Sequence, residues 1–148
     1  MTEDRRLPLA VLCLLWAGVV IGISFIEAPV KFRAPTLTRT VALDVGRTVF
    51  HASQLVQAGL AALVLAGALF GRAARRVWLC LAAAGLALAV QMAWIFPVLD
   101  ARAGAIVAGQ APSGPNPHAL YGVLEVVKVL ALGAAAILAL RQDGQLER

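Results

Sequence analysis

Charged residues are scarce in this chain of 148 residues: Asp, Glu, Lys and Arg make up 14% of it, against about 25% in an ordinary globular domain. Aromatic residues are also few, at 6%, and only two cysteines occur, Cys13 and Cys80, each inside an apolar segment. These scarcities exclude a soluble globular fold, a disordered tail and a disulfide-stapled secreted module. The sequence also lacks the P-loop, the G-x-S-x-G elbow and the H-E-x-x-H motif, so it carries no signature of the common soluble enzymes.

Hydrophobic residues are abundant instead, at 61% of the chain, and the mean hydropathy is +0.84. A helix needs about 20 apolar residues to cross the ~30 Å hydrocarbon core of a bilayer. Four stretches meet this requirement, at residues 7–26, 49–70, 77–97 and 119–140. We therefore predict an all-α integral membrane four-helix bundle, in which residues 1–148 form a single transmembrane domain.

The basic residues lie almost wholly between these apolar stretches, although the net charge is +5. This placement predicts contact with lipid headgroups and no binding of nucleic acid. The side that would hold both termini carries seven basic residues, and the other side carries five: Lys31, Arg33, Arg39, Arg47 and Arg102. Because basic loops stay in the cytoplasm, this bias predicts cytoplasmic termini. The Ala- and Arg-rich composition favours a bacterial inner membrane as the location.

The two segments on the outer side are long and half-apolar, at residues 27–48 and 98–118. Each opens with a proline-containing stretch that is typical of a helix end. We expect these segments to form either short interfacial helices or extensions of the spans.

An internal duplication is indicated by the rarest residue types. A shift of 67 residues places Cys13 on Cys80 and His51 on His118, and the chain contains only two residues of each type. We therefore predict two tandem two-span hairpins, at about residues 7–70 and 77–140. Two spans per unit preserve the orientation, so the pseudo-twofold axis would run along the membrane normal.

Two short motifs carry a resemblance to a known family. The first is Phe25-Ile26-Glu27-Ala28-Pro29-Val30-Lys31-Phe32 followed by Gly46-Arg47-Thr48-Val49-Phe50, and the second is Pro117-His118-Ala119-Leu120. Over most of its length the chain resembles the bacterial four-span family related to transmembrane protein 205. The resemblance implies a small integral membrane protein, without an assigned reaction and without catalytic residues to carry over.

Ionisable residues inside spans are costly, at ~2.5–3.5 kcal/mol each, so they are candidate functional residues. A helix turns ~100° per residue, which places His118, Tyr121, Glu125 and Lys128 on one stripe of the fourth span. His51, Gln54 and Gln57 form a matching stripe on the second span, and Gln91 and Trp94 lie one turn apart on the third. The polar intramembrane site predicted from these stripes consists of Gln54, Gln57, Gln91, Tyr121, Glu125 and Lys128.

Three functions are open for this polar site. A structural membrane subunit would use Glu125 and Lys128 as a neutral pair in the favourable order, with glutamines bonding across helices. A metal or haem site would use His51 and His118 at the outer end, with Glu27 and Asp100 as further ligands. Binding or proton-coupled transport of a small molecule by a homo-oligomer would use the Glu125–Lys128 pair. The residues do not decide whether the protein is an enzyme.

Overall fold

The computed structural model describes residues 3–141, with side chains from residue 6 onward. Every regular element in this range is helical, and four continuous helical stretches are long and apolar enough to cross a membrane: Arg6–Lys31, Arg39–Phe70, Arg75–Val107 and His118–Leu140. The chain is therefore a multi-pass, all-helical membrane protein, as the hydropathy pattern predicted. Of the basic residues behind the predicted orientation, Arg148 and the side chain of Arg5 lie outside the described part, and the orientation stays a prediction.

Two of the spans are composite. The elements in chain order are α1 (Glu3–Val20), η1 (Ile21–Glu27), α2 (Ala28–Lys31), α3 (Arg39–Phe70), α4 (Arg75–Val90), η2 (Gln91–Ile95), α5 (Phe96–Val107) and α6 (His118–Leu140). The first span joins α1, η1 and α2, and the third joins α4, η2 and α5, where η1 and η2 are π-helical segments.

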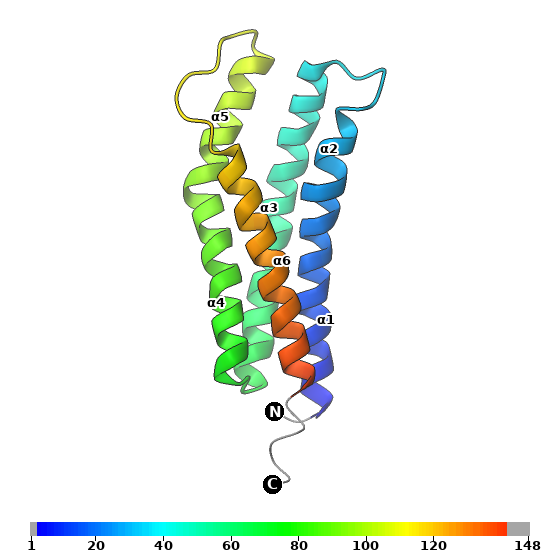
Figure 1. Ribbon diagram of the computed structural model, residues 1–148, viewed down its shortest axis with the longest axis vertical. Coiled ribbons are helices and arrows are strands. Elements are labelled where there is room, and N and C mark those ends of the chain that lie inside the picture. The colour runs from blue at the N-terminus through cyan, green and yellow to red at the C-terminus, as the bar shows by residue number, and fades with distance from the viewer. Residues whose placement is uncertain (1–2, 142–148) are drawn as a thin grey trace.

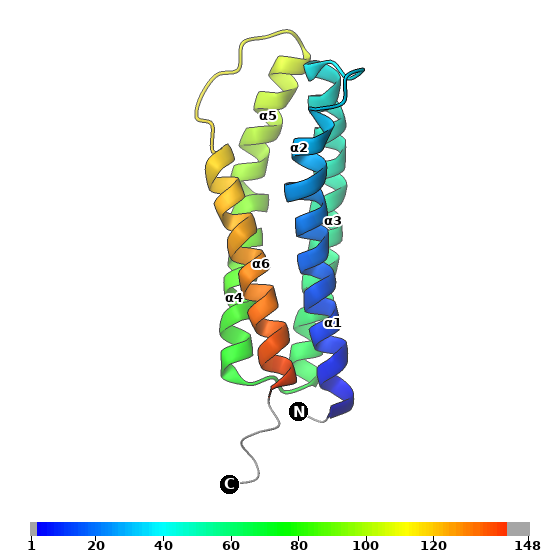
Figure 2. The ribbon, with the colours of Figure 1, turned by 45° about the vertical axis from the view of Figure 1, so that its right-hand side comes forward.

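The four spans run alternately up and down, and α6 completes the bundle by packing against both α1 and α4 (Figures 1 and 2). The described chain begins and ends at the same end of the bundle, where a short turn also joins α3 to α4; we call this the terminal end. The opposite end carries the connections at residues 32–38 and 108–117, and we call it the loop end.

The helices continue further toward the loop end than the expected boundaries near residues 26 and 97. The segments at 27–31 and 98–107 extend the spans, one of the two forms expected for them. Each extension passes through a proline, Pro29 or Pro97, that lies two residues after the end of a π-helical segment. Proline removes one backbone donor and clashes with the carbonyl four residues earlier, and a π-turn relieves both effects without ending the helix. The two halves share this device, while their origin by duplication stays a prediction.

The tightly packed core lies in the terminal half of the bundle. Its buried members come from α1, α3, α4 and α6 and include Trp16, Val64, Leu81, Leu132 and several alanines. In contrast, η1, α2 and α5 contain no buried residue. The loop half is therefore loosely packed.

Helix lengths differ at the loop end. The 32 residues of α3 extend over about 48 Å, and the 23 residues of α6 over only about 35 Å. Figure 1 shows that α3 and α5 project beyond the start of α6. Because the hydrocarbon core is ~30 Å thick, the projecting turns of α3 and α5 would reach the level of the lipid headgroups.

Candidate functional site

A layer of buried polar side chains crosses the middle of the bundle. It consists of Trp16 from α1, Gln57 from α3, Gln91 from η2, and Glu125 and Lys128 from α6. None of the five side chains is more than 2% exposed. Every span contributes to the layer, which we call the polar layer.

Lys128 is the cation at the centre of the polar layer. Its Nζ lies 2.9 Å from Glu125 Oε1 and donates a 2.6 Å hydrogen bond to Gln57 Oε1. The same Gln57 oxygen accepts a 3.2 Å bond from Trp16 Nε1, and its amide nitrogen donates to Ser53 Oγ at 3.2 Å. Lys128 thus joins α6 to α3, and α3 in turn to α1.

Gln91 completes the layer from the opposite side. Its amide nitrogen donates a 2.8 Å bond to Glu125 Oε1 and a 3.2 Å bond to the carbonyl oxygen of Tyr121. The two glutamines are oriented in a complementary way, since Gln57 presents its oxygen to the ammonium and Gln91 presents its N–H₂ to the carboxylate. The ion pair is therefore held from both sides.

Part of this buried polar surface has no hydrogen-bond partner within the described residues. Glu125 Oε2, the Tyr121 hydroxyl and Gln91 Oε1 are such atoms. Tyr121 is 5% exposed; its hydroxyl lies near the Glu125 carboxylate without the geometry of a hydrogen bond. A buried polar group that lacks a partner costs ~1–3 kcal/mol, so these atoms point to a missing partner such as water or a ligand.

A cavity of about 670 Å³ lies in the loop half, with Glu125 and Tyr121 among its lining residues. Because Glu125 belongs to the polar layer and Tyr121 lies one turn before it on α6, these two side chains form the floor of the cavity. Its walls come from η1, α2, α3, α5 and the first turns of α6. The volume lies in the ~300–1,000 Å³ range of small-molecule sites.

One wall of the cavity is formed around Lys31. Its Nζ lies 3.2 Å from Glu27 Oε2, and 5.7 Å and 5.4 Å from the ring centroids of Phe32 and Phe50. The ammonium lies directly against α3 at Gly46, where an added Cβ would lie 2.5 Å from Nζ. Glycine at this position lets the ammonium pack against the helix.

Asp100 holds α5 to α3 at the loop end. Its carboxylate makes two bonds to Arg47, at 2.9 and 3.1 Å, and one oxygen lies 3.2 Å from His51 Nε2. The bidentate geometry makes Arg47 a matched partner for this carboxylate. His51 also packs edge-on against Phe96, with ring centroids 4.8 Å apart.

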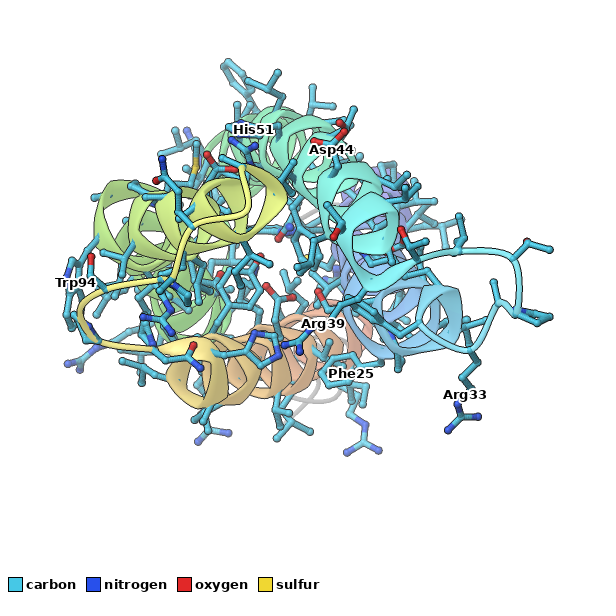
Figure 3. The ribbon with its side chains drawn as sticks, turned by 90° about the horizontal axis from the view of Figure 1, so that it is seen from above. Phe25, Arg33, Arg39, Asp44, His51 and Trp94 are labelled. Atoms are coloured by element: carbon cyan, nitrogen blue, oxygen red, sulfur yellow. The ribbon has the colours of Figure 1, made fainter. Side chains whose placement is uncertain are left out.

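Two further cations at the cavity wall have no carboxylate partner among the described residues. Arg102 donates to the backbone carbonyls of Ser113 and Gly114 at 3.0 and 2.8 Å. Arg39 begins α3 and, viewed from the loop end, lies over the space toward α6 (Figure 3). Neither guanidinium group is therefore balanced by an acidic side chain of the described residues at the cavity wall.

Most of the predicted polar site is brought together. Gln57, Gln91, Glu125 and Lys128 meet in the polar layer, and the backbone carbonyl of Tyr121 joins them. Gln54 is buried, at 4% exposed, but neither atom of its amide has a partner among the described residues.

Two other expectations need correction. Trp94 was expected on the polar stripe, but it is 56% exposed and points away from the bundle (Figure 3). The π-helical turn at η2 changes the angular spacing after Gln91, so the assumed 100° per residue does not hold there. The side chain of His51 is 59% exposed and faces α5 instead of the seam.

The sequence pattern did not predict Trp16 in the layer, Ser53 beside it or the cavity above it. Trp16 lies in an otherwise apolar span. The available signal was its indole N–H, which needs a hydrogen-bond partner when it is buried. The available signal for Ser53 was its position four residues before Gln57.

The residues predicted to hold a metal are spread over the loop half. Among the described residues, no three His, Cys, Asp or Glu side chains lie close enough together to hold a metal ion. Glu27 pairs with Lys31, Asp100 pairs with Arg47 and His51, and His118 lines the cavity from the start of α6. The geometry gives no support to a metal or haem site.

Comparison with known proteins places the chain in a family. The family described as "Domain of unknown function (DUF4149)" matches residues 11–106, so the chain belongs to this family. The match extends from α1 to the end of α5 and includes Gln57 and Gln91, while Glu125 and Lys128 lie beyond it. The searches of curated proteins and of solved structures found no match. The relation to transmembrane protein 205 and the bacterial origin stay predictions.

Proposed function

We propose that this DUF4149 member binds a small molecule in the loop-end cavity, with Glu125 and Tyr121 receiving the molecule at the floor. One observation carries the proposal: the cavity ends on two buried polar side chains whose Oε2 and hydroxyl have no partner among the described residues. A ligand that offers a donor to the carboxylate and an acceptor to the hydroxyl would satisfy both atoms.

The electrostatics of the floor favour binding over a purely structural role. A structural ion pair needs its remaining lone pairs satisfied to offset desolvation. Only one oxygen of Glu125 is so satisfied, by Lys128 and Gln91, and the other has no partner among the described residues, in a side chain that lines the cavity. The pair is thus built to receive something from the loop end.

The alternative proposal is transport coupled to protons, in which the Glu125–Lys128 pair would exchange charge with the substrate. In the described conformation the terminal half is filled by the apolar core, which includes Leu9, Trp16, Val64 and Leu132. A substrate would leave toward the terminal end only after these helices separate, so binding from one side is the function that this geometry favours.

Filling the cavity tests the proposal. Gly122 lines the cavity, and an added Cβ would meet nothing within 4 Å, so a Gly122→Leu side chain has space to enter it. Gly133 lies on the same helix, has the same free space around an added Cβ and lies outside the cavity, so Gly133→Leu is the matched control. Each purified protein is incubated with a total membrane extract, washed and analysed by native mass spectrometry.

We expect wild type and Gly133→Leu to retain a bound molecule that Gly122→Leu loses, while all three keep similar unfolding temperatures. Retention of the same molecule by folded Gly122→Leu would refute the cavity as its site. Absence of any bound molecule from wild type would refute the proposed function itself.

A further inference from the structure

We infer that the ligand of this cavity is a single-chain amphiphilic anion from the bilayer, with its anionic headgroup at Arg39 and Arg102. The inference rests on the proposed function and adds the chemical class of the ligand. It follows from the charge balance of the cavity wall, the apolar surface between the charges and the position of Phe25.

The charge balance leaves two cations uncompensated. Lys31 is paired with Glu27, Arg47 with Asp100, and Lys128 with Glu125. Within the described residues that line the cavity, Arg39 and Arg102 are then the cations without a carboxylate partner. They come from different helices: Arg39 is the first residue of α3, and Arg102 lies in the middle of α5. Guanidinium groups bind phosphate and carboxylate in bidentate geometry, so an anionic headgroup is the ligand group that these two cations favour.

The position of the cations fits a headgroup of an amphiphile. Arg39 is the first residue of α3, whose projecting turns would reach the depth of lipid headgroups, and Arg102 lies in the half of α5 nearer the loop end. Below them the wall is largely apolar and includes the rings of Phe25, Phe50 and Phe96. Such a surface suits a hydrocarbon chain, whereas a fully hydrophilic anion would lose its hydration there without compensation.

Phe25 shows where a chain can pass between the cavity and the bilayer. It lines the cavity and is nevertheless 43% exposed. Figure 3 places it at the edge of the bundle beside α6. The cavity therefore reaches the surface between η1 and α6, on a side that faces lipid.

The floor defines one more property of the ligand. The Glu125 carboxylate repels a second anionic group, so the charge of the ligand belongs at the mouth and an uncharged donor belongs at the floor. A monoacylated glycerol phosphate supplies a phosphate for the mouth and one hydrocarbon chain for the apolar wall.

The inference is tested with three probe molecules. Two of them each lack one feature of the first. Lysophosphatidic acid has the phosphate, the hydroxyl and the chain; monoacylglycerol lacks the phosphate; glycerol 3-phosphate lacks the chain. Binding of each probe is measured by native mass spectrometry on protein in maltoside micelles. The variants are Arg39→Gln, Arg102→Gln and Gly122→Leu, and Arg33→Gln is the control because Arg33 is exposed and lies outside the cavity lining.

We expect lysophosphatidic acid to bind wild type and Arg33→Gln equally. Loss of one charge-assisted contact in Arg39→Gln or Arg102→Gln should weaken its binding about tenfold, and Gly122→Leu should abolish it. Monoacylglycerol should bind at least about tenfold more weakly than lysophosphatidic acid, by the same loss of charge-assisted contacts. Glycerol 3-phosphate should not bind measurably.

The remaining outcomes separate the two proposals. Equal binding of monoacylglycerol and lysophosphatidic acid, both lost in Gly122→Leu, would overturn the anionic class and keep the cavity as a binding site. Binding of glycerol 3-phosphate as tightly as lysophosphatidic acid would overturn the amphiphile and indicate a soluble anion. Binding that is unchanged in both folded Gly122→Leu and the arginine variants would overturn this inference and the assignment of the cavity.

Discussion

The two halves of the bundle use different side chains and reach different packing. The terminal half is closed by small residues between larger ones; Ala68, Ala84, Ala135 and Ala139 are fully buried there. The loop half carries phenylalanines and long cations, and it encloses a cavity of about 670 Å³. In a bilayer, helices associate through close packing of small residues and not through a hydrophobic force between them. The comparison teaches that the bundle closes where small side chains are buried between the helices and stays open where large and charged side chains line the space between them.

The polar layer marks the boundary between the halves. On its terminal side Lys128 is held by Gln57 and Glu125, and on its loop side Glu125 and Tyr121 border the cavity. In the terminal half the layer connects the helices, and in the loop half it forms the floor of the cavity. Perturbing each half separately should therefore give different results.

The largest effect is expected at the layer itself. Lys128→Met removes the ammonium and leaves the Glu125 carboxylate buried without its cation. We expect the free energy of unfolding to fall by about 3–5 kcal/mol, measured by denaturant unfolding in micelles. Glu125→Gln/Lys128→Met removes both charges and should recover most of this loss. A loss below about 1 kcal/mol in the single variant would show that the pair is not held as described.

A smaller loss of stability is expected from a Leu→Ala substitution, and its size should differ between the two halves. Leu132 is 0% exposed in the core of the terminal half, and Leu99 lines the cavity in the loop half. We expect Leu132→Ala to lower the free energy of unfolding by about 2–3 kcal/mol and Leu99→Ala by less than about 1 kcal/mol. The reason is that truncation at position 132 creates a void, whereas truncation at position 99 enlarges an existing one. Equal losses would contradict the difference in packing.

The sequence alone was sufficient to predict an all-helical membrane fold, because four apolar stretches of spanning length are compatible with few other structures. It also placed Glu125, Lys128 and Gln57 on inward-facing polar stripes, since they follow helical periodicity on regular helices. Their burial follows directly from the cost of exposing them to lipid. That the glutamines would bond to the ion pair itself was not predicted.

The helix bounds, the direction of Trp94 and the partners of the acidic residues could not be predicted, because helical periodicity carries no information on π-helical turns or on contacts between helices. The π-helical segments before Pro29 and Pro97 let two spans continue where a helix end was expected, and η2 turned Trp94 away from the seam. The predicted metal ligands Asp100 and Glu27 found basic partners in Arg47 and Lys31. Such pairings depend on how the helices meet in three dimensions, and the sequence contains several basic residues that could have paired with each acid.

The most direct test of the central claim is the water accessibility of the two halves of α6. Gly122→Cys and Ala135→Cys are introduced separately into a Cys13→Ala/Cys80→Ala background, and each is labelled with a water-soluble maleimide in reconstituted membranes. Ala135 lies on the same helix, is 0% exposed and belongs to the core of the terminal half. A maleimide reacts with a thiolate, which forms only where water reaches the thiol. We expect rapid labelling at position 122, in the cavity, and negligible labelling at position 135, in the closed core. Equal labelling rates at the two positions would contradict an open loop half above a closed terminal half.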